Sequence, residues 1–259
     1  MPIELLIFLA VFTPALVGGL NLFFSKNPNV RDTVTLLGAL LTFYFSANIF
    51  LGFDGQATQY RLATIMPGID ISFHIEPLGI IFSLLASGLW ILTHIYAIGY
   101  MRGTREKNQS RFFFFFSVSI ASVMGISFSG NLFTLFLFYE LLTLITFPLV
   151  SHKGSSEALR GARVYLSILL GTSIGLQLLG IIWIYFSIGT LDFVKGGILN
   201  GSFSSLELII LVGLFAFGIG KAALFPFHRW LPAAMVAPTP VSALLHAVAV
   251  VKAGGIYRS

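Results

Sequence analysis

Five ionisable side chains lie inside long apolar runs of the sequence, where they could carry protons or small cations. They are His94, Glu140, Lys221, His246 and Lys252. A charged group at the centre of a lipid bilayer costs at least ~2.5–3.5 kcal/mol on insertion scales. Such groups need partners or water, and they mark ion and proton pathways. A carboxylate, two amines and two imidazoles in this setting predict a relay that moves protons between fixed sites.

Glu140 and Lys221 are the natural pair of opposite charge. Each lies near the middle of its apolar run, and Thr143 shares the helix face of Glu140 about one turn on. We expect the carboxylate and the ammonium group to be in contact, directly or through one water. When paired, both groups are charged; when separated, the lysine can release its proton, which is the outline of a proton switch. The alternative is a static buried ion pair that contributes to specificity rather than to transport.

His246 and Lys252 are six residues apart, which on an α-helix is ~9 Å of rise and about 120° of rotation. They cannot share a hydrogen bond, but ordered waters can link them, and histidine titrates near physiological pH. The alternative for His246 is a simple helix–helix contact. We expect His94 mainly to hydrogen-bond across helices, with proton transport as its lesser role. His228 is a candidate for proton entry at the cytoplasmic interface.

The segment around Lys221 combines an apolar run with prolines. Pro226 lies in this run, where a proline removes a backbone hydrogen bond and clashes with the preceding helical turn, and three more prolines follow. Non-helical backbone at membrane depth survives only where protein or a water-filled cavity surrounds it. We therefore predict a membrane helix interrupted near Phe225–Pro232, and we expect it to be the working part of a transport pathway.

The composition predicts an all-α integral membrane protein. Of its 259 residues, 56% are hydrophobic and only 10% are charged, whereas soluble domains carry about 25% charged residues. Several apolar runs exceed the roughly 20 residues that cross a bilayer. We predict about eight transmembrane helices, with the first retained rather than cleaved as a signal and the seventh broken near Pro226. The predicted spans are 3–24, 31–53, 78–101, 112–129, 131–150, 163–189, 207–228 and 240–257.

Charge and cysteine content narrow the possible functions. The net charge of +5 is carried mainly by loops and does not indicate a nucleic-acid partner. The sequence has no cysteine, which excludes disulfides, thiolate chemistry and cysteine-ligated metal clusters. We predict no cofactor, no metal site and no catalytic chemistry in this chain. It would take part in an enzyme only as a translocating subunit of a redox-driven complex.

The basic residues predict the orientation in the membrane. One set of alternate loops carries ten lysines and arginines, and the other set carries three. Because cytoplasmic loops are enriched in these residues, we expect the first set inside the cell and the N-terminus outside, in the cell (inner) membrane.

Two further segments, 54–77 and 112–116, have sequence patterns that predict their local structure or surroundings. The polar segment 54–77 contains apolar residues at alternating positions, such as Ile69, Ile71 and Phe73, and we expect it to form a short extracytoplasmic hairpin. The five phenylalanines at 112–116 are expected to face lipid and to anchor the helix at the interface.

Three stretches carry a family resemblance. GKAALFPFHRWLPAAMVAPTPVSALLHAVAVVKAG, YELLTLITFPLV and IEPLGIIFSLLASGLWILTHIYAIGYM resemble motifs of antiporter-like, proton-conducting membrane subunits. These subunits occur in Mrp-type sodium/proton antiporters, in respiratory complex I and in membrane-bound hydrogenases. The resemblance implies that Glu140 is the ion-pair glutamate, that Lys221 is the central lysine, and that His246 or Lys252 connects the path onward.

The resemblance also implies an organisation in two parts. Residues 1–111 would hold the first three helices and the hairpin, and residues 112–259 would form one antiporter-like repeat of spans four to eight. Family members continue for about as many residues again, so we expect this chain to match the N-terminal half of such a subunit, either split or truncated. We favour a proton-translocating subunit of an Mrp-type antiporter, with other membrane subunits as partners and sodium as a candidate substrate. The alternative is a proton-pumping subunit of an NADH:quinone oxidoreductase-like or hydrogenase complex.

Overall fold

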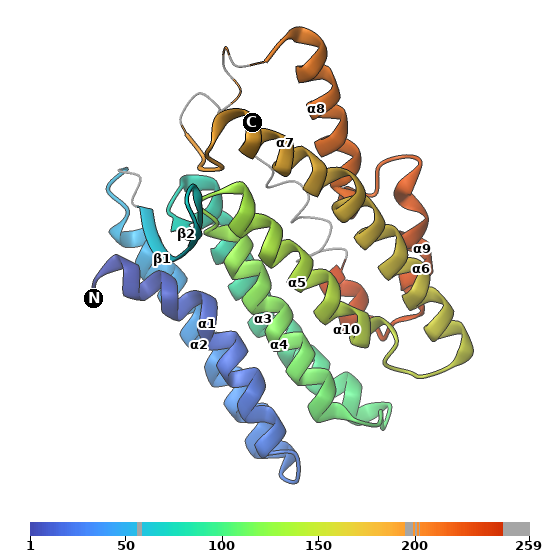
Figure 1. The fold of residues 1–259 in the computed structure, drawn as a ribbon. Helices are drawn as coiled ribbons and strands as arrows, with labels where there is room; N and C mark the ends of the chain where they lie inside the picture. The colour runs from blue at the N-terminus through green and yellow to red at the C-terminus, as the bar shows by residue number, and fades with distance from the viewer. Residues whose placement is uncertain (56–58, 195–198, 200, 202, 246–259) are drawn as a thin grey trace.

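Among the residues that the structure describes, six helices are long and apolar enough to cross a membrane. The computed structural model describes residues 1–259 except 56–58, 195–198, 200, 202 and 246–259. His246, Lys252 and most of the predicted eighth span therefore lie outside the described residues. The six helices lie side by side in one bundle (Figure 1). They are α1 (Ile3–Phe23), α2 (Pro28–Gly52), α3 (Pro77–Gly103), α4 (Gln109–Ser127), α5 (Leu132–Val150) and the continuous run Ser156–Ile188.

Local sequence signals decide where these helices begin. Pro28 and Pro77 stand in the first turns of α2 and α3, where a helix does not need the N–H that proline lacks. The side chains of Asn131 and Ser155 cap α5 and the following helix by accepting a hydrogen bond from a first-turn N–H group. The first five predicted spans agree with the structure within three residues at each end.

The central helix of the bundle is α4, which packs against α1, α3 and α5. In its apolar stretch 72% of the residues are buried, against 39–44% in the other five candidate spans. Phe112, Phe113 and Phe116 are each about 1% exposed, so the prediction that this run faces lipid is wrong. Phe113 packs edge-on against His94 and Phe112 against His152. Composition does not reveal that neighbouring helices surround α4 at this end.

The predicted hairpin is present between α2 and α3. Strand β1 (Gln59–Met66) pairs antiparallel with β2 (Ile69–His74), and Gly68 takes a φ of +77° in the turn. Strand β2 rests on the start of α5, where Asn131 Nδ2 donates to the Asp70 carbonyl at 2.7 Å. The hairpin thus covers the end of the bundle away from the α3–α4 loop (Figure 1).

The sixth span is longer than predicted and contains an irregular turn. We expected it to begin at residue 163, but it begins with α6 (Ser156–Thr172) and ends with α7 (Leu178–Ile188). Between them, Ser173–Gln177 form a single π-helical turn. Such turns inside α-helices are frequent at functional sites.

The seventh predicted helix breaks earlier than its prolines indicate. Helix α8 (Ser205–Gly218) begins at a capping box and ends before Lys221, well short of Pro226. The predicted interruption at Phe225–Pro232 therefore begins too late, because contacts with the sixth span end the helix first. Short elements follow: η2 (Gly220–Ala222), η3 (Phe227–Arg229), α9 (Trp230–Ala233), η4 (Ala234–Val236) and α10 (Thr239–Ala243).

Cysteines placed singly at positions 107 and 190 are expected to label from opposite sides of the membrane. Lys107 lies in the α3–α4 loop and Thr190 follows α7, so three spans separate them. The basic bias predicts that position 107 faces the cytoplasm. The natural chain has no cysteine, so Lys107→Cys and Thr190→Cys can be labelled in intact cells with a membrane-impermeant maleimide without background. Labelling of both from the same side would contradict this topology.

Candidate functional site

Lys221 lies inside the break that follows α8, with no exposed surface. Its Nζ donates to the Tyr139 carbonyl at 2.7 Å and to Thr143 Oγ1 at 2.6 Å. The ammonium also lies 3.1 Å from the centre of the Tyr139 ring, a favourable cation–π position. The backbone N–H of Lys221 donates to the Tyr139 hydroxyl at 3.2 Å. The lysine is thus held against α5 by one turn of that helix.

Crowding against the sixth span ends α8 at this point. A Cβ atom on Gly218 would lie 2.6 Å from the backbone nitrogen of Gln177, in the π turn. A Cβ atom on Gly220 would collide with the Thr172 hydroxyl. The Gly220 carbonyl accepts a hydrogen bond from Trp230 Nε1 at 2.8 Å, which holds the chain beyond the break against its start. Only glycine permits so close an approach at these two positions, and Lys221 directly follows the second of them.

Glu140 is half-buried on α5, next to the residues that bind Lys221. Neither carboxylate oxygen has a hydrogen-bond donor within 3.5 Å among the described residues, although the hydroxyl of Ser173 in the π turn is near enough to interact with the carboxylate. Glu140 and Lys221 interact electrostatically, but no ion pair within 4.0 Å joins them among the described residues. The expected direct contact is therefore absent from this structure, because the ammonium group is turned to Tyr139 and Thr143. Contact through one water stays a prediction.

A buried polar line continues along α5 from the lysine. Thr143 and Thr146 have no exposed surface, and Thr146 Oγ1 lies 2.6 Å from the hydroxyl of Tyr165 on α6. The Tyr165 ring packs edge-on against Trp230 beyond the break. Hydroxyl groups both donate and accept hydrogen bonds. This line therefore offers polar groups between the lysine and the α5–α6 end of the bundle.

The structure locates two of the predicted histidines apart from Lys221. His94 is buried in α3, and its Nε2 lies 3.1 Å from the Asp32 carbonyl of α2. This confirms the expected hydrogen bond across helices. His228 is exposed and stacks on Phe225 within the segment that follows the break. Among the described residues, no hydrogen bond, ion pair or ring contact joins either histidine to Lys221, and their roles in proton movement stay predictions.

Sequence reasoning missed Tyr139, Tyr165 and the π turn. Tyr139, Thr143 and Thr146 are spaced by four and three residues, so they share one helix face. This spacing is a signal that could have been found in the sequence. Nothing comparable marks Tyr165 or the turn Ser173–Gln177, because both depend on how α6 packs against the broken segment.

The fold and the site define a class of multi-pass membrane protein in which a lysine is buried at an interrupted helix. The chain belongs to the family described as NADH:quinone oxidoreductase/Mrp antiporter, transmembrane, which matches residues 129–258, half of the chain. Residues 66–113 match a second family, described as the N-terminus of chain 5 of NADH-ubiquinone oxidoreductase (complex I). The resemblance to the antiporter-like family is therefore confirmed.

The curated relatives of this chain include a putative antiporter subunit and a subunit of a quinone oxidoreductase. The chain is 34% identical over 249 residues to the putative antiporter subunit mnhA2 of Staphylococcus haemolyticus, covering 91% of this chain and 30% of the relative. It is 33% identical to chloroplastic NAD(P)H-quinone oxidoreductase subunit 5 of Ipomoea purpurea, covering 95% of this chain and 37% of the relative. The chain thus spans about a third of the length of these two relatives.

Two solved structures have the same fold. One belongs to the membrane-bound sulfane sulfur reductase, an archaeal respiratory membrane complex, with a TM-score of 0.82 over 97% of this chain and 51% of the other. The other belongs to the Mrp complex from Dietzia sp. DQ12-45-1b, with a TM-score of 0.84 over 96% of this chain and 27% of the other. Both are 23% identical to this chain, so they show the fold alone.

Proposed function

We propose that this chain forms part of a proton-translocating subunit in an Mrp-type sodium/proton antiporter. The observation that carries the proposal is Lys221, a fully buried lysine in the break of an apolar helix. An intramembrane ionisable residue of this kind is by default a functional site. In the wider protein, other membrane subunits would be its partners and sodium its second substrate, with the N-terminus on the outer side.

In this proposal Lys221 holds a proton between two transfers. The Tyr139 carbonyl, the Thr143 hydroxyl and the Tyr139 ring stabilise its charged form. Glu140 adds a negative charge nearby but does not form a direct ion pair with the Lys221 ammonium group. The lysine can therefore exchange partners through small movements of its flexible stem. Rotation of the ammonium toward Glu140 would strengthen its hold on the proton, and separation would favour release.

Proton entry and exit use different parts of the chain. The hydroxyls of Thr146 and Tyr165 would, with waters, connect Lys221 to the cytoplasmic end of the bundle. His228, in the exposed segment after the break, would be a second point of entry at that side. His246 and Lys252, outside the described residues, would continue the path away from Lys221, as the family resemblance implies.

A second candidate function is proton pumping within a redox-driven complex. The 33% identity to a chloroplastic NAD(P)H-quinone oxidoreductase subunit favours it, as does the fold shared with a respiratory membrane complex. The same side chains of this chain would move the protons. Only the source of energy, electron transfer in other subunits, would differ.

Sodium added to inverted membrane vesicles is expected to release a preformed proton gradient when the complete complex is present. The vesicles would come from cells that lack other sodium/proton antiporters, and a pH-sensitive dye would report the gradient. The matched control is the same complex carrying Glu140→Gln, which keeps the shape of the side chain and removes its charge. Proton movement that requires an electron donor and ignores sodium would reject the antiporter and support the redox-driven pump.

A further inference from the structure

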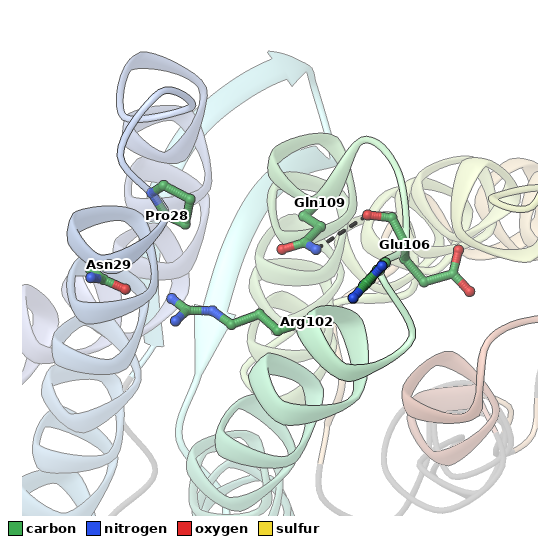
Figure 2. A pocket seen from close by; sticks show the side chains of 6 residues that line it. Pro28, Asn29, Arg102, Glu106 and Gln109 are labelled. Carbon is green, nitrogen blue, oxygen red and sulfur yellow. Dashed lines mark hydrogen bonds between the residues drawn. The ribbon is translucent and has the colours of Figure 1, made fainter.

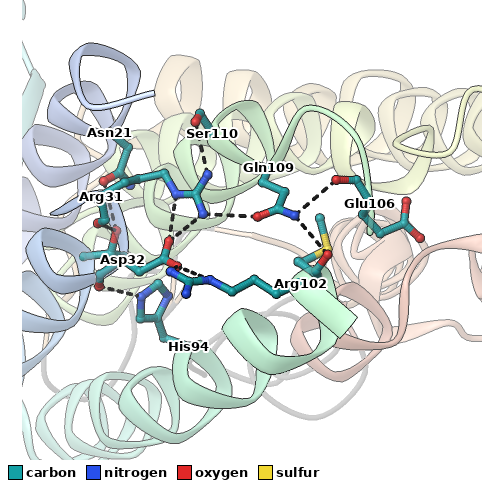
Figure 3. Close-up of polar contacts among 10 residues, drawn as sticks. Asn21, Arg31, Asp32, His94, Arg102, Glu106, Gln109 and Ser110 are labelled. Carbon is teal, nitrogen blue, oxygen red and sulfur yellow. Dashed lines mark hydrogen bonds and ion pairs between the residues drawn. The ribbon is translucent and has the colours of Figure 1, made fainter. Parts of the chain in front are cut away.

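A cluster of charged residues outside the proton path lies where α2 and α4 begin and α3 ends. Asp32, 4% exposed, accepts hydrogen bonds from two arginines. Arg31 Nε lies 2.7 Å from its Oδ1, and Arg102 Nε lies 3.1 Å from its Oδ2 (Figure 3). Arg31 is itself 2% exposed. Two guanidinium groups share one carboxylate, so the cluster keeps a net positive charge.

Hydrogen bonds to the first residues of α4 hold this cluster in a fixed shape. Arg31 donates from Nη1 to Ser110 Oγ and from Nη2 to Gln109 Oε1, both at 3.2 Å. Gln109 Nε2 in turn donates to the carbonyls of Met101, at 2.9 Å, and Glu106, at 3.2 Å. The first turn of α2 is thus bound to both ends of the loop. A site built on these groups is preorganised, which lowers the cost of binding a ligand.

A cavity of about 550 Å³ opens beside the cluster. Its lining consists of Pro28, Asn29, Arg102, Arg105, Glu106 and Gln109 (Figure 2). The side chain of Arg102 is 41% exposed there, and it extends toward Asn29 (Figure 2). Arg105 is exposed as well. The Glu106 carboxylate is turned away from Arg102 (Figure 2), so it does not occupy the space between the arginine and α2.

The electrostatics of this cavity favour a single negative charge. The cavity and the cluster beside it together hold three arginines, at 31, 102 and 105, and two carboxylates, at 32 and 106, which leaves a formal charge of +1 for these five groups. The first turn of α2 adds the positive end of a helix of 25 residues. Arginine recognises phosphate oxygens well, since its planar group donates several hydrogen bonds in fixed directions.

The surroundings of the cavity are those of a lipid headgroup. It lies at the ends of membrane-spanning helices, whose outer faces continue from it as apolar surface. Large apolar side chains are exposed on α2 (Leu37, Leu40, Leu41) and on α3 (Leu89, Leu92, Ile95). Helices α2 and α3 pack against one another, so acyl chains can lie along this pair while the headgroup sits at its end. Basic pockets between membrane helices bind anionic headgroups in this way.

We infer that this cavity binds the headgroup of an anionic phospholipid, with Arg102 and Arg105 on its phosphate and Asn29 beside it. A lipid with one net negative charge matches the cavity. A zwitterionic lipid would bring its ammonium group against the same arginines. The basic bias of the loops assigns the lipid to the cytoplasmic leaflet, where anionic lipids are abundant.

Titration of the delipidated complex with dioleoyl-phosphatidylglycerol is expected to raise its thermal unfolding temperature. Arg105→Gln should weaken the apparent affinity about fivefold, as the loss of one arginine near an anionic surface entails. Asn29→Asp should weaken it similarly, because it adds a negative charge to the cavity. An acidic residue in the first turn of a helix favours the helix, so this variant should keep the fold intact.

The matched control is Arg160→Gln, which removes an exposed arginine from α6, away from the cavity. It should respond to the lipid as the natural chain does. Dioleoyl-phosphatidylcholine should give no comparable shift in either protein. Equal responses of the natural chain, Arg105→Gln and Asn29→Asp would overturn the site. Equal protection by inorganic phosphate would also overturn it, since a soluble anion would then be the ligand.

Discussion

Replacing Lys221 with methionine is expected to abolish proton translocation in the assembled complex. Methionine keeps much of the length and the apolar stem of lysine, but it has no group that binds a proton. We expect a loss of roughly a hundredfold or more in rate, the lower end of what a positioned proton-transfer group contributes. The polar partners at Tyr139 and Thr143 are on a stable helix, so the complex should still assemble. Proton uptake into vesicles, measured with the amount of assembled complex, tests this.

Lys221→Arg separates the carrier role from a fixed charge. Arginine stays protonated at any relevant pH, so it should preserve the positive charge and still block proton release. Normal transport in this variant would show that Lys221 does not deprotonate and only positions ions and water. Lys153→Met, in the exposed turn between α5 and α6, is the matched control and should leave transport unchanged.

Gly218→Ala is expected to destabilise the protein and to displace the lysine from its site. The new methyl group would lie 2.6 Å from the backbone nitrogen of Gln177, and backbone cannot yield as a flexible side chain does. Overpacking of this kind costs about 1–3 kcal/mol. We expect a lower thermal unfolding temperature together with reduced proton transport, because the break that carries Lys221 must shift.

Gly213→Ala provides the control on the same helix. A Cβ atom at this position meets nothing within 4 Å, and alanine in a helix is favoured over glycine by about 0.5–1 kcal/mol. This variant should therefore be as stable as the natural chain or slightly more so. If both alanine variants lost stability equally, close contact between α8 and the π turn would not be what ends the helix.

The prolines and the glycines of this region show why the break was predicted too late. Pro226 is a strong local signal, and a rule that considers one helix at a time places the interruption there. The helix ends at Gly218 because Gln177 and Thr172 of another span approach it. That contact joins residues more than 40 positions apart in the sequence. The glycines themselves are the only local sign of it in the sequence of α8.

The phenylalanines at 112–116 and the buried Arg31 also show that the sequence of one helix does not reveal which other helices pack against it. The run at 112–116 has the composition of a lipid-facing anchor, yet three of its rings point into the bundle. Arg31 is one of the ten lysines and arginines that the basic bias assigns to the cytoplasmic loops, but it lies buried in the first turn of α2 against Asp32. In both cases the environment is supplied by neighbouring helices, and the sequence of one helix does not contain it.

The amino-acid sequence alone determined the membrane class, the first five spans, the hairpin and the candidate residues Glu140 and Lys221. Apolar length, helix caps and the cost of burying charge act locally, so they can be read along the chain. Only the tertiary structure decided where α8 ends and which groups hold the lysine. It turned the ammonium group to Tyr139 and Thr143 instead of directly to Glu140, because packing of α5, the sixth span and the broken segment fixes those distances.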